Sequence, residues 1–319
     1  MKTFDEIYEE LQRGESNELN RTWETAKKQN EKANKIALSS CLIVDILLLI
    51  IFREKIIKDF SIMIIPIIAV YGIVINFGLY MIVCILSSSN KKSLQYKGKY
   101  KEIVIKKLMN NFYDNVEYFP NKEMPEYIYD KLQYEYYDIY ESDDYMEGQI
   151  NNKYSIQMAE VLTQKEDEYE DSEGETQTRE ITLFHGLFAK ISMEKSINCE
   201  LKIMQNGELL SNKRLKMDSS EFEKHFDVQA SNSIIGMQLL TADVMEELID
   251  FENKTKMKFD VVIKENELYL RFHSEDMFEP INIKKGPLDR KSIEKYFYML
   301  NFTYNLSNKL INLVNETEI

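Results

Sequence analysis

The residue whose chemistry stands out most is Asp45, a carboxylic acid near the middle of an apolar run over residues 36–52. A carboxylate at the centre of a bilayer costs roughly 2.5–3.5 kcal/mol on insertion scales, so such a residue is usually protonated or paired. A second apolar run covers residues 62–86. If it forms an antiparallel helix beside the first run, Asn76 and Tyr71 fall at a depth similar to that of Asp45. These three residues are the intramembrane polar candidates.

Two interpretations of Asp45 are compatible with the sequence. In the first, Asp45 is a proton or ion site in an oligomeric assembly. In the second, a neutral Asp45 hydrogen-bonds to Asn76 or to a neighbouring subunit and holds helices together; Gly72, on the same helical face as Asn76, lets a partner backbone approach. We favour the second interpretation, because two spans per chain form a pore only if several chains assemble.

A group of lysines follows the second apolar run and forms the second set of candidates. Cations beside a membrane attract anionic lipid at about 1 kcal/mol for each well-placed charge. They also mark the cytoplasmic side of a membrane protein. The lipid-headgroup candidates are Lys91, Lys92, Lys97, Lys99 and Lys101.

The remaining metal-binding and nucleophilic residue types give weak signals. His185, His225 and His273 share no ligand spacing, so a three-histidine zinc site is the less favoured interpretation and we expect no metal. Residues 166–171 resemble a calcium loop in charge alone, because the glycine register of an EF-hand fails, and we expect a solvated hairpin tip there. Cys199 has no adjacent basic residue and is expected to be a core thiol.

No catalytic signature is found in the sequence. It lacks a G-x-S-x-G elbow, a Walker A loop, a G-x-G-x-x-G loop and an H-E-x-x-H motif. We therefore expect no cofactor, and an enzyme is the least favoured class of function.

The net charge is −14, nearly all of it in residues 91–319. So acidic a region repels nucleic acid, which makes DNA or RNA an improbable partner.

The two apolar runs predict the elements that position Asp45. A span needs about 20 apolar residues, so helices over residues 36–52 and 62–86 are predicted to form a transmembrane hairpin. The alternative is a buried helical hairpin in a soluble protein. Lysines flank both runs, so the positive-inside rule places the N-terminus and residues 91–319 in the cytoplasm. The predicted localisation is the cell inner membrane, as a multi-pass protein.

The rest of the chain alternates between helical and strand periods. A capping box at Thr3 and Glu6 predicts a short amphipathic helix that ends near Gly14. Further helices are expected over residues 96–112, 125–132, 222–226, 241–253 and 287–313. Strands are expected over residues 145–150, 154–164, 177–193, 198–204, 257–263 and 267–273.

These elements predict three parts of the chain. Residues 1–35 form an N-terminal cytoplasmic helical segment, residues 36–86 the transmembrane hairpin, and residues 91–319 one cytoplasmic domain. The fold class is α+β, with a mainly antiparallel sheet and a long C-terminal helix.

The order of parts resembles a family of uncharacterised bacterial membrane proteins that is known as a domain of unknown function. The resemblance implies two N-terminal membrane helices followed by a cytoplasmic α+β domain, and it implies no activity or catalytic residue. It covers nearly the whole chain through the order and spacing of short motifs. These motifs are Tyr145-Met146-Glu147-Gly148, Ala159-Glu160-Val161, Phe184-His185-Gly186-Leu187-Phe188, Phe222-Glu223-Lys224-His225-Phe226 and Phe278-Glu279-Pro280.

Three classes of function follow, in order of preference. The first is a membrane-anchored cytoplasmic binding or scaffold module, since tethering raises the local concentration of its ligand. The second is an oligomeric channel or transporter subunit that uses Asp45, and the third is a membrane-bound enzyme. The expected partners are the lipid bilayer, including anionic lipid, and either another protein or further copies of this chain.

Overall fold

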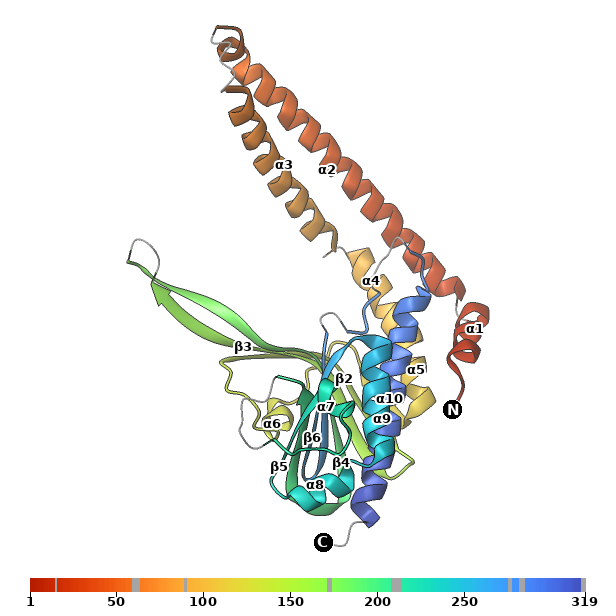
Figure 1. Cartoon of the computed structure of the whole chain (residues 1–319). Helices are drawn as coiled ribbons and strands as arrows, with labels where there is room; N and C mark the ends of the chain where they lie inside the picture. The colour runs from red at the N-terminus through yellow and green to blue at the C-terminus, as the bar shows by residue number, and fades with distance from the viewer. Residues whose placement is uncertain are drawn as a thin grey trace. The chain divides into compact units, whose positions relative to one another are not determined.

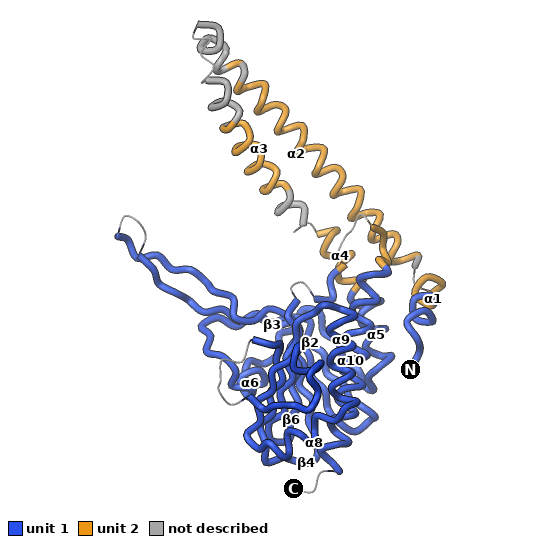
Figure 2. Tube along the Cα trace, in the orientation of Figure 1, with its two compact units in different colours: residues 1–9, 101–279, 290–319 blue, residues 10–100, 280–289 orange. Residues whose placement is uncertain are grey.

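The computed structural model describes residues 1–14, 16–58, 64–88, 91–170, 174–207, 214–274, 277–280 and 285–316, with side chains for all of these except residues 16, 49, 51–58, 64–69, 71 and 84–88. The chain divides into two compact units, drawn in different colours in Figure 2. The α+β unit contains residues 1–9, 101–279 and 290–319. The helical unit contains residues 10–100 and 280–289.

The first helix begins where the capping box predicts. In α1 (Phe4–Gly14) the backbone N–H of Thr3 donates to the carboxylate of Glu6 at 2.8 Å, and the Thr3 hydroxyl accepts from the N–H of Glu6. This reciprocal pair satisfies donors that a helix start leaves without a partner.

Three further helices make up most of the helical unit. α2 (Ser16–Lys58) continues for 43 residues, from the polar N-terminal segment into the first apolar run. α3 (Ile64–Ser88) lies beside it and returns in the opposite direction, as Figure 1 shows. α4 (Lys91–Tyr100) also contacts α2. A helical hairpin is therefore present where the apolar runs predict one.

Among the residues that the structure describes, no helix is both long enough and apolar enough to cross a membrane. The two spans expected at residues 36–52 and 62–86 are thus not supported by the described residues. The described side chains of the second run begin at Val70 and end at Val83. This stretch is shorter than a membrane span, which requires about 20 apolar residues. The remaining side chains of both runs lie outside the described part of the chain.

An antiparallel sheet, with six strands among the described residues, forms the centre of the α+β unit. Its strands are β1 (Asp114–Phe119), β2 (Ile139–Ile150), β3 (Tyr154–Glu170), β4 (Thr176–Gln205), β5 (Phe226–Ala230) and β6 (Lys258–His273). The strands pair in the order β1-β2-β3-β4-β5, and β6 pairs with β4. The fold is therefore mixed α+β with an antiparallel sheet.

Strand β6 bends back on itself. An extended strand from Asp260 to His273 would be about 43 Å long, yet the side chains of these two residues approach to 3.0 Å. Glu265, between them, has a left-handed φ of 56°, and the register against β4 shifts here. The sequence predicts a hairpin of two strands here, over residues 257–263 and 267–273, but the structure has one bent strand, and both of its halves pair antiparallel with β4.

Two cores lie on opposite faces of the strands, because successive side chains alternate. On one face α9 (Ala242–Thr255) and α10 (Arg290–Glu316) pack beside each other and contribute Phe251 and Phe302, which stack at 4.0 Å and meet Phe272 of β6. On the other face α6 (Glu126–Asp130) contributes Tyr129, which packs with Phe184 and Phe188. Figure 1 shows the pairing of the two long helices.

Several short elements were not expected from the sequence. Strand β1 is polar on its exposed face, and β5 follows directly after α7 (Phe222–His225). α8 (Ser233–Leu239) is a seven-residue helix capped by the side chain of Asn232. The expected helix over residues 96–112 is present, but it contains a π-helical segment, η1 (Lys101–Ile105), before α5 (Lys106–Phe112).

Candidate functional site

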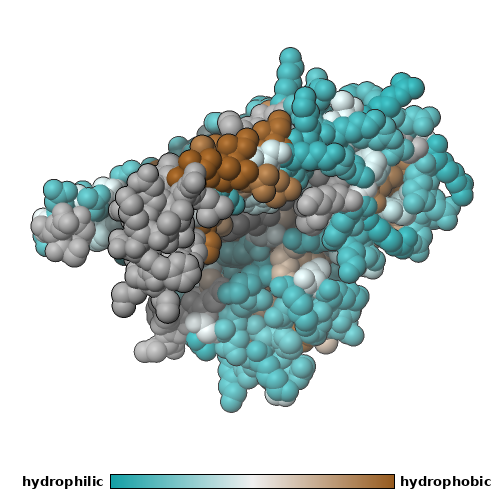
Figure 3. Space-filling model, turned by 90° about the horizontal axis from the view of Figure 1, so that it is seen from above, coloured by the Kyte–Doolittle hydropathy of each residue, from teal (hydrophilic) through white to brown (hydrophobic). Residues whose placement is uncertain are grey.

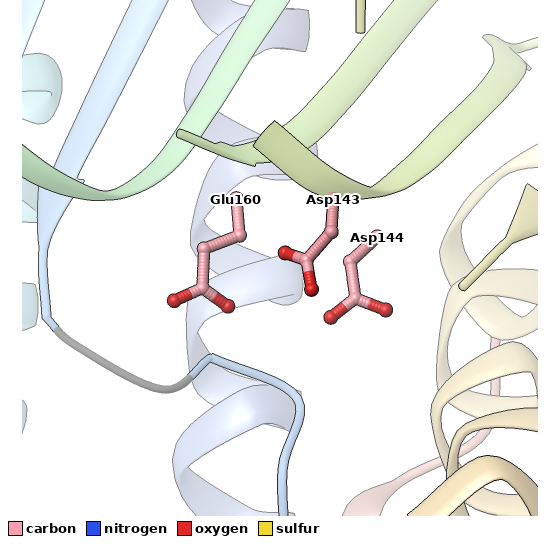
Figure 4. Close-up of side chains that lie close together, drawn as sticks. All are labelled: Asp143, Asp144 and Glu160. Carbon is pink, nitrogen blue, oxygen red and sulfur yellow. The ribbon is translucent and has the colours of Figure 1, made fainter. Parts of the chain in front are cut away.

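Three carboxylates meet where β2 pairs with β3. Asp143 lies opposite Glu160 in the antiparallel ladder, so the two side chains point to the same side of the sheet. The register then shifts before Met146, and Asp144 takes a left-handed φ of 55°, which is the geometry of a bulge that inserts one extra residue. Figure 4 shows all three side chains pointing to one side. One oxygen of each lies within 4.8 Å of the others, and we call this group the carboxylate cluster.

Asp144 is the most completely buried member of the carboxylate cluster. Its side chain is fully buried and accepts hydrogen bonds from the Lys101 ammonium at 2.6 Å and from the Tyr118 hydroxyl. The same ammonium lies 2.9 Å from Glu279. Burial raises the pKa of Asp144 to about 6, even though Lys101 opposes the shift. Lys101 therefore neutralises one charge of the cluster from within the protein.

Glu160 differs from Asp144 because no lysine among the described residues contacts it. Burial, followed by the negative charge of Asp143, raises the pKa of Glu160 to about 8. Its Oε1 lies 3.2 Å from Nε2 of His185, on the neighbouring strand β4. A carboxyl group with a pKa near neutrality can exchange a proton at physiological pH.

The carboxylate cluster has the donor set for a hard cation. Calcium, magnesium and manganese ions prefer carboxylate oxygens, and three such oxygens converge here. Among the described residues, no other group of three or more potential metal ligands converges in this way. Asp143 is exposed, so solvent reaches the cluster from that side.

The placement of Lys101 departs from the sequence-based expectation. Lys101 was expected to meet lipid headgroups, but its side chain is 8% exposed and its charge is paired with Asp144 and Glu279. A π-helical turn carries one more residue than an α-helical turn. In η1 it turns Lys101 to the buried side together with Val104 and Ile105.

Asp45 and Asn76 lie together in the helical unit, as the sequence analysis expects. The amide nitrogen of Asn76 donates to Oδ1 of Asp45 at 2.7 Å. A Cβ atom added to Gly72 would lie 3.7 Å from the same oxygen, so this glycine leaves room for the carboxylate. The side chain of Tyr71 lies outside the described residues.

The other lysine candidates lie on α4. Lys91 and Lys92 are exposed at its start, while Lys97 and Lys99 are half-buried. Lys99 forms an ion pair with Glu18 of α2 at 3.1 Å. A lipid contact by these four lysines stays a prediction.

The histidines and the cysteine occupy separate places. His185 contacts Glu160, His225 contacts Glu252 at 2.5 Å, and His273 contacts Asp260. Each imidazole thus has its own carboxylate partner, and the three histidines do not form one site. Cys199 is buried, and its Sγ lies 3.5 Å from the carbonyl of Asn232, as expected for a core thiol.

The acidic run is a strand rather than a turn. Residues 166–170 continue β3 and pair with β4 as far as Thr176, so the strands extend beyond the expected limits. In Figure 1 these residues form an arm that projects from the body of the α+β unit. Asp167 pairs with Arg179 across the arm at 2.6 Å. Asp171 lies outside the described residues.

The carboxylate cluster is not evident from the sequence. Glu160 lies between the apolar residues Ala159 and Val161, and alternation alone puts it on the opposite face, where a charged residue in a strand is ordinarily solvated. A buried acid becomes visible only when the pairing with Asp143 and the bulge at Asp144 are known. The one sequence signal was the short motif that contains Glu160.

Comparisons with known proteins give a partial match. Residues 182–311 match a family described as "Protein of unknown function (DUF3137)". This segment runs from within β4 to within α10 and excludes Asp143, Asp144 and Glu160. The match supports the resemblance to a family of unknown function. No curated protein matches the sequence.

One similar solved structure is described as the mycobacterial trehalose monomycolate transport factor A, TtfA. The alignment covers 67% of this chain and 95% of that chain, with 8% sequence identity and a TM-score of 0.35. A TM-score this low does not establish a shared fold. What the comparisons support is that residues 182–311 resemble a domain of unknown function.

Proposed function

We propose that this protein is a binding module that is anchored to a membrane by the α2–α3 hairpin and that binds its ligand through the α+β unit. The observation that carries the proposal is the exposure of apolar side chains on the hairpin. Figure 3 shows hydrophobic side chains, drawn in brown, gathered together at the surface.

The exposed apolar surface follows both helices of the hairpin. Its side chains are 39–68% exposed and belong to Ile36, Leu38, Leu42, Ile43, Ile46, Leu47, Ile50, Val70, Ile73, Val74, Ile75, Phe77, Tyr80, Met81 and Ile82. Soluble monomers rarely expose so many contiguous apolar side chains, and such patches mark a membrane or protein contact. Lipid is the favoured contact because the surface lies on both helices and continues the apolar runs of the sequence.

The hydrogen bond between Asn76 and Asp45 supports an anchoring role over a channel role. It joins α2 to α3 within one chain, so it needs no second subunit. Interhelical hydrogen bonds between polar side chains hold membrane helices together. In this proposal residues 91–319, which include the lysines of α4, face the cytoplasm.

The test is membrane retention of the full chain. We expect the wild-type protein to stay in alkali-washed membranes and to require detergent for extraction. The double variant Ile43→Lys, Ile73→Lys places two charges on the exposed apolar surface and should be lost from the membrane fraction. The matched control is Tyr136→Lys, Ile234→Lys, two exposed apolar residues of the α+β unit, which should stay with the membrane.

Two outcomes would overturn the proposal. One is a wild-type chain that is monodisperse without detergent. The other is equal retention of both double variants.

Orientation is tested in a cysteine-free variant by labelling a cysteine at Lys55 and one at Glu173 with an impermeant thiol reagent. We expect labelling at residue 55 and protection at residue 173 in intact cells.

A further inference from the structure

A cleft of about 300 Å³ runs between α9 and α10 in the α+β unit. One wall is acidic, because Asp243, Glu246, Glu247 and Asp250 recur on one face of α9 at helical spacing. The other wall carries Asn301 and Asn305 of α10. The cleft is lined by different residues from the carboxylate cluster.

The base of the cleft is aromatic. Phe251 and Phe302 stack at 4.0 Å and are 5% and 3% exposed, so they present a small apolar surface to the cleft. Tyr298, which is 38% exposed, adds a third aromatic side chain to the lining. Aromatic rings attract organic cations and pack against methylene groups.

The acidic wall is only partly neutralised by the chain. Glu247 pairs with Lys309, and Asp250 lies 3.7 Å from Lys254. Asp243 and Glu246 have no cationic partner among the described residues. The side-chain amides of Asn301 and Asn305 likewise have no protein hydrogen-bond partner there, so their carbonyl oxygens are available to a donor in the cleft.

Lys309 shows how this cleft receives an ammonium group. Its Nζ contacts the carboxylate of Glu247 and donates to the backbone carbonyl of Asp243 at 3.4 Å. Oxygen atoms of the first turns of α9 therefore already coordinate one ammonium. Glu246 offers a further carboxylate along the same wall, and no described lysine contacts it.

The spacing of the carboxylates selects against a single metal ion. A metal ion needs ligand atoms that converge. No three carboxylates of this cleft come as close together as those of Asp143, Asp144 and Glu160. Asp243 and Asp250 are seven residues apart, or about 10 Å along the helix axis. An elongated ligand with several positive charges matches this spacing.

We propose that the α9–α10 cleft binds a linear aliphatic polyamine. Its ammonium groups contact Asp243, Glu246 and the carbonyls of Asn301 and Asn305, while its methylene groups lie over the aromatic base. The volume suits a small molecule, being at the lower limit for ligand pockets. This proposal names a ligand for the binding role of the α+β unit and rests on that role, but it does not depend on membrane anchoring.

The experiment is calorimetric titration of spermine into the full chain in uncharged detergent. We expect one site, an affinity that falls with added salt, and weaker binding of the shorter diamine putrescine. The variant Asp243→Asn, Glu246→Gln should weaken spermine binding by about five- to thirtyfold, the factor that corresponds to losing two charge contacts. Both residues lie at the surface of α9, and thermal melting checks that the variant stays folded.

The control removes the same charge from another acidic surface. Glu166→Gln, Glu168→Gln changes two exposed residues of β3 and should alter the affinity by less than about twofold. Equal weakening by both double variants would mean that spermine follows the overall negative charge, which would overturn the cleft proposal. So would displacement of spermine by magnesium ions at matched ionic strength, or absence of binding. Membrane retention tests the anchor separately, so failure of either proposal can be recognised.

Discussion

The helical hairpin and the α+β unit differ in where their apolar side chains lie. In the hairpin, apolar side chains such as Phe77 are exposed, and a hydrogen bond between Asn76 and Asp45 joins the two helices. In the α+β unit, Phe272 and its aromatic neighbours are fully buried. Charged residues cover its surface, and the few that are buried have partners.

The two regions therefore need different surroundings. Burial of apolar side chains away from water is the main force that stabilises a folded domain, and the α+β unit gains it from its own cores. The described part of the hairpin buries few large apolar side chains and depends on another apolar phase for the same gain. We infer that changes at matched positions in the two regions have different consequences.

The largest expected difference is between two phenylalanines. Phe272→Ala leaves a cavity among Phe251, Phe259 and Phe302, and we expect it to lower the free energy of unfolding by about 3–5 kcal/mol. Phe77 is 65% exposed, so Phe77→Ala should leave the unfolding of the α+β unit unchanged. Urea unfolding followed by near-ultraviolet circular dichroism of tyrosine measures both. A similar loss in the two variants would contradict the comparison.

A smaller effect is expected from the buried acid Glu160, whose pKa of about 8 exceeds its ordinary value near 4.3. Between these pH values the folded state binds a proton that the unfolded state releases, so the free energy of unfolding falls as pH rises. The loss starts near the unfolded pKa and is complete above the folded one. Asp144, whose pKa is raised to about 6, also lowers the free energy of unfolding as pH rises, but at lower pH values.

Glu160→Gln removes the ionisable group and tests this pH dependence. We expect the variant to be more stable than the wild type by roughly 1–3 kcal/mol above pH 8, and equally stable near pH 4. The matched control is Glu166→Gln, an exposed glutamate on the same strand, which should follow the wild-type profile. Thermal melts across this pH range give the answer. Parallel wild-type and Glu160→Gln profiles would show that Glu160 is already ionised in the folded protein.

The two regions also differ in how far the sequence predicted them. Asp45 and Asn76 were placed together because a polar residue stands out in an apolar run and because helix geometry sets its depth. In the α+β unit the sequence predicted the antiparallel sheet and the C-terminal helix, since their periods of two and 3.6 are local properties. Its candidate site was not predicted.

Local sequence patterns do not predict the carboxylate cluster, for two physical reasons. The bulge at Asp144 depends on the pairing of β2 with β3, and pairing is a long-range property. The π-helical turn at Lys101 changes which side of the helix is buried, and a regular 3.6-residue period does not contain that change. One irregularity occurs at a residue of the cluster and the other at the lysine that pairs with it, and local rules are expected to fail at such sites.

The smallest expected effect concerns Asp45 in the hairpin. If Asp45 is neutral and only hydrogen-bonds to Asn76, Asp45→Asn keeps a side chain of similar shape with a donor and an acceptor, so the hairpin should assemble as in the wild type. Asp45→Leu removes the bond and should weaken helix association by about 0.5–2 kcal/mol. Energy transfer between labels on α2 and α3 in reconstituted vesicles, titrated with denaturing detergent, measures the association.

The same variants decide between anchoring and transport. A residue that carries protons or cations must ionise, so asparagine would abolish transport as completely as leucine while assembly survives. A residue that joins two helices tolerates asparagine and is damaged only by leucine. We expect the second pattern, because the Asn76 amide already meets the carboxyl oxygen within one chain and Gly72 leaves room for it. Proton or cation flux through vesicles that is present in the wild type and absent in Asp45→Asn would make Asp45 a transport residue, and the hairpin would then be more than an anchor.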